Sequence, residues 1–251
     1  MKKNDERPFY GYVALASTVF FIVVFLISGI LVLLFFSVLI GVLLIIVGIY
    51  NIISYLYSIY LIRPHKTLDQ SDVLKLKGNE LILDAGCGLG RATIGFAKQL
   101  KTGKIIGVDI WDKIEIPGNS AERAYRNAEI EGVKDKVEFR FGDTFNLPFK
   151  DEHFNVVVCA GLITSFHNHE LKLKALKELR RVLKTNGIFL MREPINSIKT
   201  YIIITPSVLY IRLPTKKHWI ELLEKSGFKN IEFYQHRVSG SFKMIKPNKK
   251  G

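Results

Sequence analysis

The stretch LILDAGCGLGRAT, residues 81–93, carries three glycines at alternate positions shortly after an acidic residue. Residues 81–83 are apolar and predict a short buried strand, and residues 92–100 predict the body of a helix. The glycines therefore fall at a strand-to-helix turn, where they let a ligand approach the main chain closely. The helix start beyond them favours a negative group on that ligand. A plain tight turn is the alternative, but a single glycine would satisfy it.

The spacing of these glycines separates two kinds of nucleotide site. Counting G-x-G-x-x-G from Gly86 reaches Arg91, and counting from Gly88 reaches Thr93, so the dinucleotide fingerprint is not formed. The remaining pattern, D-x-G-x-G-x-G, resembles the cofactor loop of class I S-adenosylmethionine-dependent methyltransferases. The positions that match are Asp84, Gly86, Gly88 and Gly90. S-adenosylmethionine has no pyrophosphate, so such a loop wraps an amino-acid moiety whose ammonium needs carbonyl and carboxylate acceptors.

Two further expected strands end in acidic residues. Residues 104–109 close on Asp109, whose carboxylate can accept hydrogen bonds from both ribose hydroxyls. Ile110 and Trp111 follow and offer an apolar surface to an adenine ring. Residues 137–143 end on Asp143, and the resemblance implies that this side chain accepts a hydrogen bond from the adenine amino group. A single aspartate is more often a turn or cap residue, but the ordered series favours a cofactor site.

The rest of the chain fits a doubly wound α/β fold. Asn119, with Glu122 three positions later, predicts the start of a helix that runs to Glu131. Later runs predict a strand, a helix capped by Asn168, a strand, a helix and two final strands, at 154–160, 169–186, 187–193, 216–228, 230–238 and 241–247. The resemblance, which covers roughly residues 75–247, implies a seven-stranded Rossmann-like methyltransferase sheet whose last two strands form an antiparallel pair.

A run of 54 residues without a charged side chain, 9–62, precedes this domain. One membrane span takes about 20 apolar residues, so the run has room for two transmembrane helices and a turn. A secretory signal would have a much shorter apolar region and a small-residue cleavage site. The turn lies either at 37–41 or at 28–29, the latter leaving a tyrosine-rich interfacial segment. We therefore expect a membrane anchor over residues 1–66 and a methyltransferase domain over 67–251.

Basic residues flank the apolar run on both sides. Before it stand Lys2, Lys3 and Arg7, and after it Arg63 and Lys66. The excess of positive charge in short loops marks the cytoplasmic side of a membrane protein. We therefore predict a multi-pass protein of the cell membrane with both termini and the catalytic domain in the cytoplasm.

Amino-acid composition and net charge indicate which classes of molecule the protein could bind. The net charge is +13, nearly all of it beyond residue 62, which suits either nucleic acid or an anionic lipid surface. The apolar run favours the lipid bilayer, and no aromatic-basic nucleic-acid module stands out, although a lysine-rich soluble surface stays open. The two cysteines, Cys87 and Cys159, fit a reducing compartment, and no residues have the spacing of metal ligands.

The implied reaction is in-line transfer of a methyl group from a sulfonium to an N, O, C or S acceptor, with positioning supplying most of the rate. His167 is a candidate base for acceptors that must lose a proton, or simply a polar loop residue beside Asn168. His169 is expected in the first helical turn, facing solvent. Residues 194–214 are apolar and aromatic, and they predict an acceptor lid, a membrane-dipping segment or an ordinary connection.

The combination of hairpin and domain resembles an uncharacterised group of membrane-anchored methyltransferase-type proteins. We expect a small hydrophobic or lipid-like acceptor. The alternatives are a non-catalytic sensor that binds S-adenosylmethionine and, disfavoured by the glycine spacing, a NAD-dependent oxidoreductase. Because the glycine loop, Asp109 and Asp143 lie outside residues 1–62, deletion of that segment is expected to leave cofactor affinity nearly unchanged.

Overall fold

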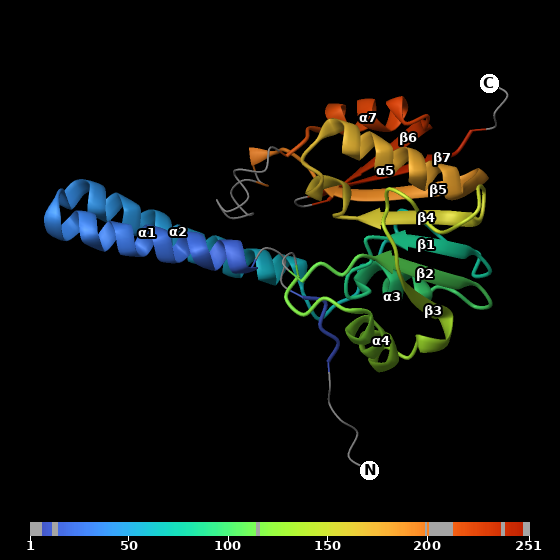
Figure 1. Ribbon diagram of the computed structural model, residues 1–251, viewed down its shortest axis with the longest axis horizontal. Helices are drawn as coiled ribbons and strands as arrows, with labels where there is room; N and C mark the ends of the chain where they lie inside the picture. Colours follow the sequence, from blue (N-terminus) through green and yellow to red (C-terminus); the bar gives the residue numbers. More distant parts are fainter. Residues whose placement is uncertain are drawn as a thin grey trace, which may run out of the picture.

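The computed structural model describes residues 7–11, 15–113, 116–198, 200, 213–236 and 239–247. Within these ranges a pair of long helices precedes a seven-stranded sheet with helices on both faces. The helix pair projects away from the sheet as a rod (Figure 1). The expected doubly wound α/β fold is confirmed, whereas the division of the chain at residue 66 stays a prediction.

The sheet runs in the order β3-β2-β1-β4-β5-β7-β6. Its strands are β1 (Leu81–Ala85), β2 (Lys104–Asp109), β3 (Val137–Phe141), β4 (Phe154–Ala160), β5 (Leu183–Pro194), β6 (Lys229–Gln235) and β7 (Ser239–Ile245). The first five strands pair in parallel, and β7 is antiparallel to both of its neighbours, as expected for the last two strands. The strand order reverses between β1 and β4, and sheets of this type bind ligands at such a switch point, outside the carboxyl ends of the strands.

Helices cover the two faces of the sheet because each carries an apolar stripe. On one face lie α3 (Arg91–Ala97) and α4 (Ala121–Ile130), whose small and apolar residues pack on Ile82 and Ile105. On the other face lie α5 (His169–Val182) and α7 (Lys216–Lys225), and Leu176, Leu179 and Trp219 are fully buried there. Two short 3-10 turns, η1 (Lys134–Lys136) and η2 (Ile163–Ser165), lie in the connections.

Side chains cap the first turns of α4 and α5, and the cap of α4 is one residue later than the sequence predicted. The cap of α4 is Ser120, whose hydroxyl accepts from the backbone N–H of Arg123, and not Asn119. Asn119 is buried, and its amide donates to the carbonyl of Asp112 instead. The predicted cap of α5 is confirmed, because the Asn168 side chain accepts from the N–H of Glu170. The helix after the glycine loop is shorter than expected and ends at Ala97.

The helix pair consists of α1 (Leu15–Phe35) and α2 (Val38–Ile62), joined by a two-residue turn. The break coincides with the even division of the apolar run, since α2 follows Ser37. Close packing of the helices needs glycine: a Cβ at Gly41 would come within 2.5 Å of the Leu33 backbone. By length and composition both helices can cross a membrane, and only 11% and 22% of their apolar windows are buried. A core helix of a soluble protein would be mostly buried.

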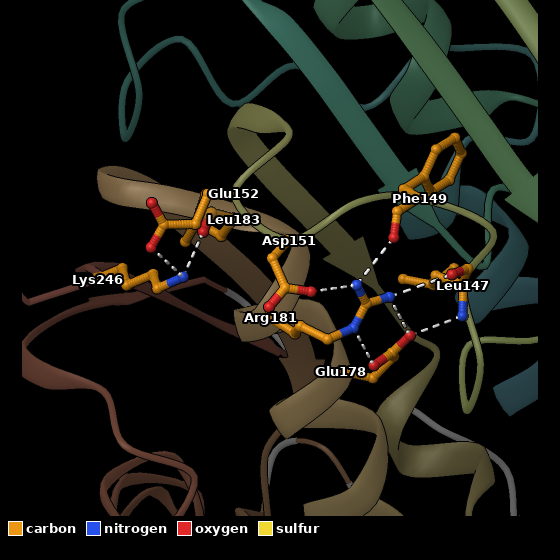
Figure 2. A network of polar contacts seen from close by, with 8 residues as sticks. All are labelled: Leu147, Phe149, Asp151, Glu152, Glu178, Arg181, Leu183 and Lys246. Carbon is orange, nitrogen blue, oxygen red and sulfur yellow. Dashed lines mark hydrogen bonds and ion pairs between the residues drawn. The ribbon is translucent and has the colours of Figure 1, made fainter. Parts of the chain in front are cut away.

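A polar cluster joins α5, the connection between β3 and β4, and the start of β5 (Figure 2). Arg181, near the end of α5, donates to Glu178, to Asp151 and to the carbonyls of Leu147 and Phe149. These bonds join α5 to the connection between β3 and β4. Beside them, the buried ammonium of Lys246 donates to the carbonyl of Leu183 at 2.6 Å. Charge-assisted bonds of this kind are about twice as strong as neutral ones, so the cluster stabilises the junction between α5 and the β3–β4 connection.

Candidate functional site

The glycine loop lies at the carboxyl ends of β1 and β4, next to the switch point of the sheet. In Figure 1 these strands point toward the side from which the helix pair projects. The start of the loop is bonded to β2, since the N–H groups of Gly86 and Cys87 both donate to the carbonyl of Val108. The strand-to-helix turn predicted from the sequence is therefore present, with β1 ending at Ala85 and α3 beginning at Arg91.

The backbone conformation of the loop favours glycine at all three positions. Gly86, Gly88 and Gly90 have φ angles of +71°, +51° and +84°, in the left-handed region that side chains disfavour. A Cβ at Gly86 would lie 2.9 Å from Leu162, and one at Gly90 would lie 2.9 Å from the ring of Phe139. The loop is thus a backbone surface that a larger residue would both strain and fill.

Asp84 lies beneath the loop at the end of β1. Its side chain is buried and accepts a 2.6 Å hydrogen bond from the hydroxyl of Thr93 on α3. Burial raises the pKa of Asp84 to about 7, and the bonds from Thr93 oppose this shift only in part. Asp84 therefore ties the strand to the helix on either side of the glycines. Direct contact with a cofactor ammonium stays a prediction.

Asp109, at the end of β2, faces the loop. Its carboxylate accepts from the N–H of Gly88 at 2.8 Å and from the N–H of Trp111 at 2.6 Å. Burial raises the pKa of Asp109, and these backbone bonds oppose the shift. A carboxylate has about four acceptor positions, so two backbone donors leave capacity for the ribose hydroxyls expected from the sequence.

The role of the two residues after Asp109 in facing an adenine stays a prediction, and Trp111 is partly buried against the core cluster that contains Ile105. Ile110 is 54% exposed, which is unusual for an isoleucine beside a core strand. Trp111 has a φ of +50°, and its indole N–H donates to the carbonyl of Gly88 at 3.2 Å. Asp109 and Trp111 together therefore fix both the N–H and the carbonyl of the central loop glycine.

The side chains of the remaining predicted site residues are exposed, unlike that of Asp84. Asp143 is exposed just after β3, and its carboxylate accepts from the N–H of Phe145 at 2.8 Å. His167 is exposed before α5, and His169 is exposed in the first turn of that helix, as expected. The roles of Asp143 and His167 stay predictions. Most of the predicted acceptor segment, 201–212, and the basic pair Lys2 and Lys3 lie outside the described residues.

Glu193 is a buried acid at this edge that the sequence analysis missed. It lies at the end of β5 and is fully buried. Its carboxylate accepts from the N–H of Ile163 at 2.9 Å and from the hydroxyl of Thr164 at 2.6 Å. Burial raises the pKa of Glu193 to about 7. The side chain thus holds the connection after β4 in place, and Leu162 of that connection lies beside Gly86.

These raised pKa values predict how stability depends on pH. Below about pH 4 the buried acid is protonated in both folded and unfolded chains, and its contribution to stability is complete. As the pH rises toward 7, the unfolded chain loses the proton first, so stability falls. For Glu193 we expect a loss of roughly 2 kcal/mol between pH 5 and pH 8 in denaturant unfolding of the detergent-solubilised protein. Glu193→Gln should flatten that part of the profile, and parallel profiles for the two proteins would contradict it.

Comparison with known proteins agrees with this geometry. Residues 76–205 match the family model of a methyltransferase domain. The chain is 32% identical over 143 residues to an uncharacterised methyltransferase of Schizosaccharomyces pombe, an alignment that covers 56% of this chain and 49% of the relative. It is 27% identical over 183 residues to the demethylmenaquinone methyltransferase of Lactobacillus johnsonii, covering 63% of this chain and 71% of the relative.

A solved structure agrees at the level of the fold. The S-adenosylmethionine-dependent methyltransferase of Aquifex aeolicus superposes with a TM-score of 0.54 at 18% identity, covering 68% of this chain and 84% of that one. The chain spans between 42% and 63% of the length of three curated relatives. The family model nevertheless covers more than half of the chain and includes every element of the glycine loop. The chain therefore belongs to the class I methyltransferase family.

Proposed function

We propose that the protein is a membrane-anchored methyltransferase that uses S-adenosylmethionine and methylates a hydrophobic acceptor. The observation that carries the cofactor assignment is the glycine loop at the switch point, with three positive φ angles and with Asp109 bonded to its central glycine. This set fits S-adenosylmethionine, because glycines keep side chains out of the loop and the carboxylate has acceptor capacity left. The glycine spacing of a pyrophosphate site is absent from the sequence.

The residues of this chain have positioning roles in the proposed reaction. When bound, S-adenosylmethionine supplies a methyl group on an activated sulfonium. Asp109 would hold the ribose, Ile110 and Trp111 would face the adenine, and the glycine loop would hold the amino-acid end. Asp143 would accept from the adenine amino group, and His167 would serve as a base only for an acceptor that has to lose a proton. Well-oriented reactants gain about 7–11 kcal/mol from proximity, so such positioning accounts for most of the rate.

The anchor and the acceptor are proposed from the helix pair. Two helices of 21 and 25 residues, largely exposed and uncharged, suit a bilayer better than water. The carboxyl ends of β1 and β4 lie on the side of the sheet from which the helices project, which would bring the glycine loop near the membrane surface (Figure 1). A net charge of +13 suits anionic lipid, and the flanking basic residues suit a cytoplasmic domain. The Lactobacillus relative, by its name, methylates demethylmenaquinone, which supports a hydrophobic acceptor here.

Cofactor identity is tested by calorimetry on the full chain in detergent micelles. We expect S-adenosylhomocysteine to bind and NAD to give no heat, because the loop lacks the spacing of a pyrophosphate site. Binding of NAD without binding of S-adenosylhomocysteine would overturn the proposal. Incubation with methyl-labelled S-adenosylmethionine and native membranes then separates an enzyme from a sensor. A sensor would bind the cofactor but leave the lipid, protein and nucleic-acid fractions unlabelled.

A further inference from the structure

The segment before the helix pair, residues 7–11, here called the leader, packs on the methyltransferase domain. The backbone N–H of Phe9 donates to the side-chain oxygen of Asn127 at 3.0 Å, and the Asn127 amide donates back to the carbonyl of Phe9 at 2.9 Å. Asn127 is buried on α4, 118 positions away along the chain. A side chain that pairs with both backbone groups of one residue holds that residue much as a neighbouring strand would.

Tyr10 fixes the leader more firmly. It is 5% exposed and belongs to the core cluster that contains Ile94 of α3. Its N–H donates to the carbonyl of Pro64, and its hydroxyl reaches Glu131 at 3.3 Å. Burial of an aromatic side chain stabilises by about 1.5–3 kcal/mol. The leader is therefore part of the folded domain although it precedes the apolar helices in sequence.

The same asparagine touches the glycine loop. The amide of Asn127 also donates to the carbonyl of Leu89 at 3.0 Å, so one side chain joins the leader to the loop. Gly11 extends this contact: a Cβ placed there would lie 2.6 Å from Ile116 and 3.4 Å from Leu89. Ile116 in turn lies against Gly88, where a Cβ would meet it at 3.3 Å. The leader thus lies directly behind the two central residues of the loop.

The chain that leaves the helix pair reaches the loop from the other flank. The side chain of Arg91, the residue directly after the loop, donates to the carbonyl of Lys66 at 3.0 Å. The N–H of Leu68 donates to the carbonyl of Arg91 at 3.1 Å. The leader therefore reaches the loop through Asn127, and residues 66–68 are bonded to Arg91, the first residue after the loop. The expectation that deleting residues 1–62 leaves cofactor affinity nearly unchanged stays a prediction, but that deletion also removes the leader, which reaches the loop through Asn127.

We propose that the leader and residues 64–68 position the glycine loop, so that packing of the leader and cofactor affinity are thermodynamically coupled. Asn127 is the positioning residue, since it alone bonds to both the leader and the loop among the described contacts. The inference rests on the proposed function, in which this loop binds S-adenosylmethionine. Coupling is reciprocal: if the leader raises cofactor affinity, the cofactor must hold the leader more tightly by the same factor.

The first test measures affinity for S-adenosylhomocysteine by calorimetry on the full chain in lipid nanodiscs. Gly11→Ala moves the leader away from Ile116 and strains a residue whose φ is +83°. Asn127→Asp retains an acceptor for Phe9 but loses the donors to Leu89 and to the Phe9 carbonyl. We expect each variant to raise the dissociation constant by about 5-fold or more. Glu129→Gln, on the exposed side of the same helix, is the matched control and should bind like wild type.

The second test uses the unaltered protein and needs no variant to fold. Saturating S-adenosylhomocysteine should slow hydrogen exchange at the amides of Phe9 and Tyr10, which bond to Asn127 and Pro64. A purely structural leader would not respond to the cofactor. Unchanged exchange at both amides, or Gly11→Ala binding like wild type, would overturn the coupling. Failure of the wild type to bind S-adenosylhomocysteine at all would instead overturn the proposed function.

Discussion

Asp109→Ala is expected to lower the affinity for S-adenosylhomocysteine by about 10²–10⁴-fold. In the proposed site the change would remove two charge-assisted hydrogen bonds to the ribose, each worth about 1.5–3 kcal/mol, and 1.4 kcal/mol corresponds to tenfold. It also frees the N–H groups of Gly88 and Trp111, which the carboxylate now orders. Calorimetry on the full chain measures the effect.

Two further variants make the Asp109 prediction specific. Asp109→Asn keeps one acceptor oxygen and should bind with intermediate affinity. Asp135→Ala removes an exposed acid in η1, which precedes the amino end of β3. This variant should bind like wild type. If folded Asp109→Ala retained wild-type affinity, the ribose would be held elsewhere and the assignment of this carboxylate would fail.

Replacement of residues 12–62 by a short glycine-serine linker is expected to preserve cofactor binding but to lower methyl transfer to a membrane-embedded acceptor by about 10²–10⁴-fold. Tethering raises the effective concentration of an enzyme at its substrate by factors of this size. The leader stays in place in this variant, because the N–H of Tyr10 bonds directly to Pro64 and a short linker spans the gap. Deletion of residues 1–62 would remove the leader as well and would confound anchoring with loop support.

The comparison uses initial rates of label transfer from methyl-labelled S-adenosylmethionine into the lipid fraction of native membranes. The same membranes dissolved in detergent are the control, in which the two proteins should transfer label at similar rates. Equal rates on intact membranes would show that the helices do not bring the site to its acceptor, and the hydrophobic-acceptor proposal would lose its main support.

Sequence periodicity predicted the strands, glycine spacing predicted the strand-to-helix loop, and the family resemblance implied the seven-stranded sheet. This succeeded because local features carry the signal: three glycines in five positions can be read from the sequence alone, and each of the first two strands ends at or one residue beyond the predicted aspartate. The break between the two apolar helices at Ser37 was likewise one of two positions read from composition. The glycine spacing, the strand ends and the helix break can each be recognised from a few consecutive residues.

The residues that the sequence analysis missed act over long distances. Asn127 falls on the same helix face as Ala124 and Ala128, and a polar residue among small buried ones was the signal that was overlooked. Its partners Phe9 and Leu89 lie 118 and 38 positions away, so no local pattern connects them. Glu193 ends an apolar strand and meets its partners only when β4 and β5 pair. Side-chain contacts between distant elements depend on the fold and cannot be read before it.

The strand order also constrains how the protein is made. β6 leaves the ribosome before β7, yet in the described sheet it pairs only with β7, which separates it from β5. β6 therefore has no partner until the following strand has been synthesised and inserted beside β5. An unpaired strand edge is prone to association with other chains. A chain that ended before residue 239 would leave β6 without a partner in this way, so pairing with β7 protects β6 from association with other chains.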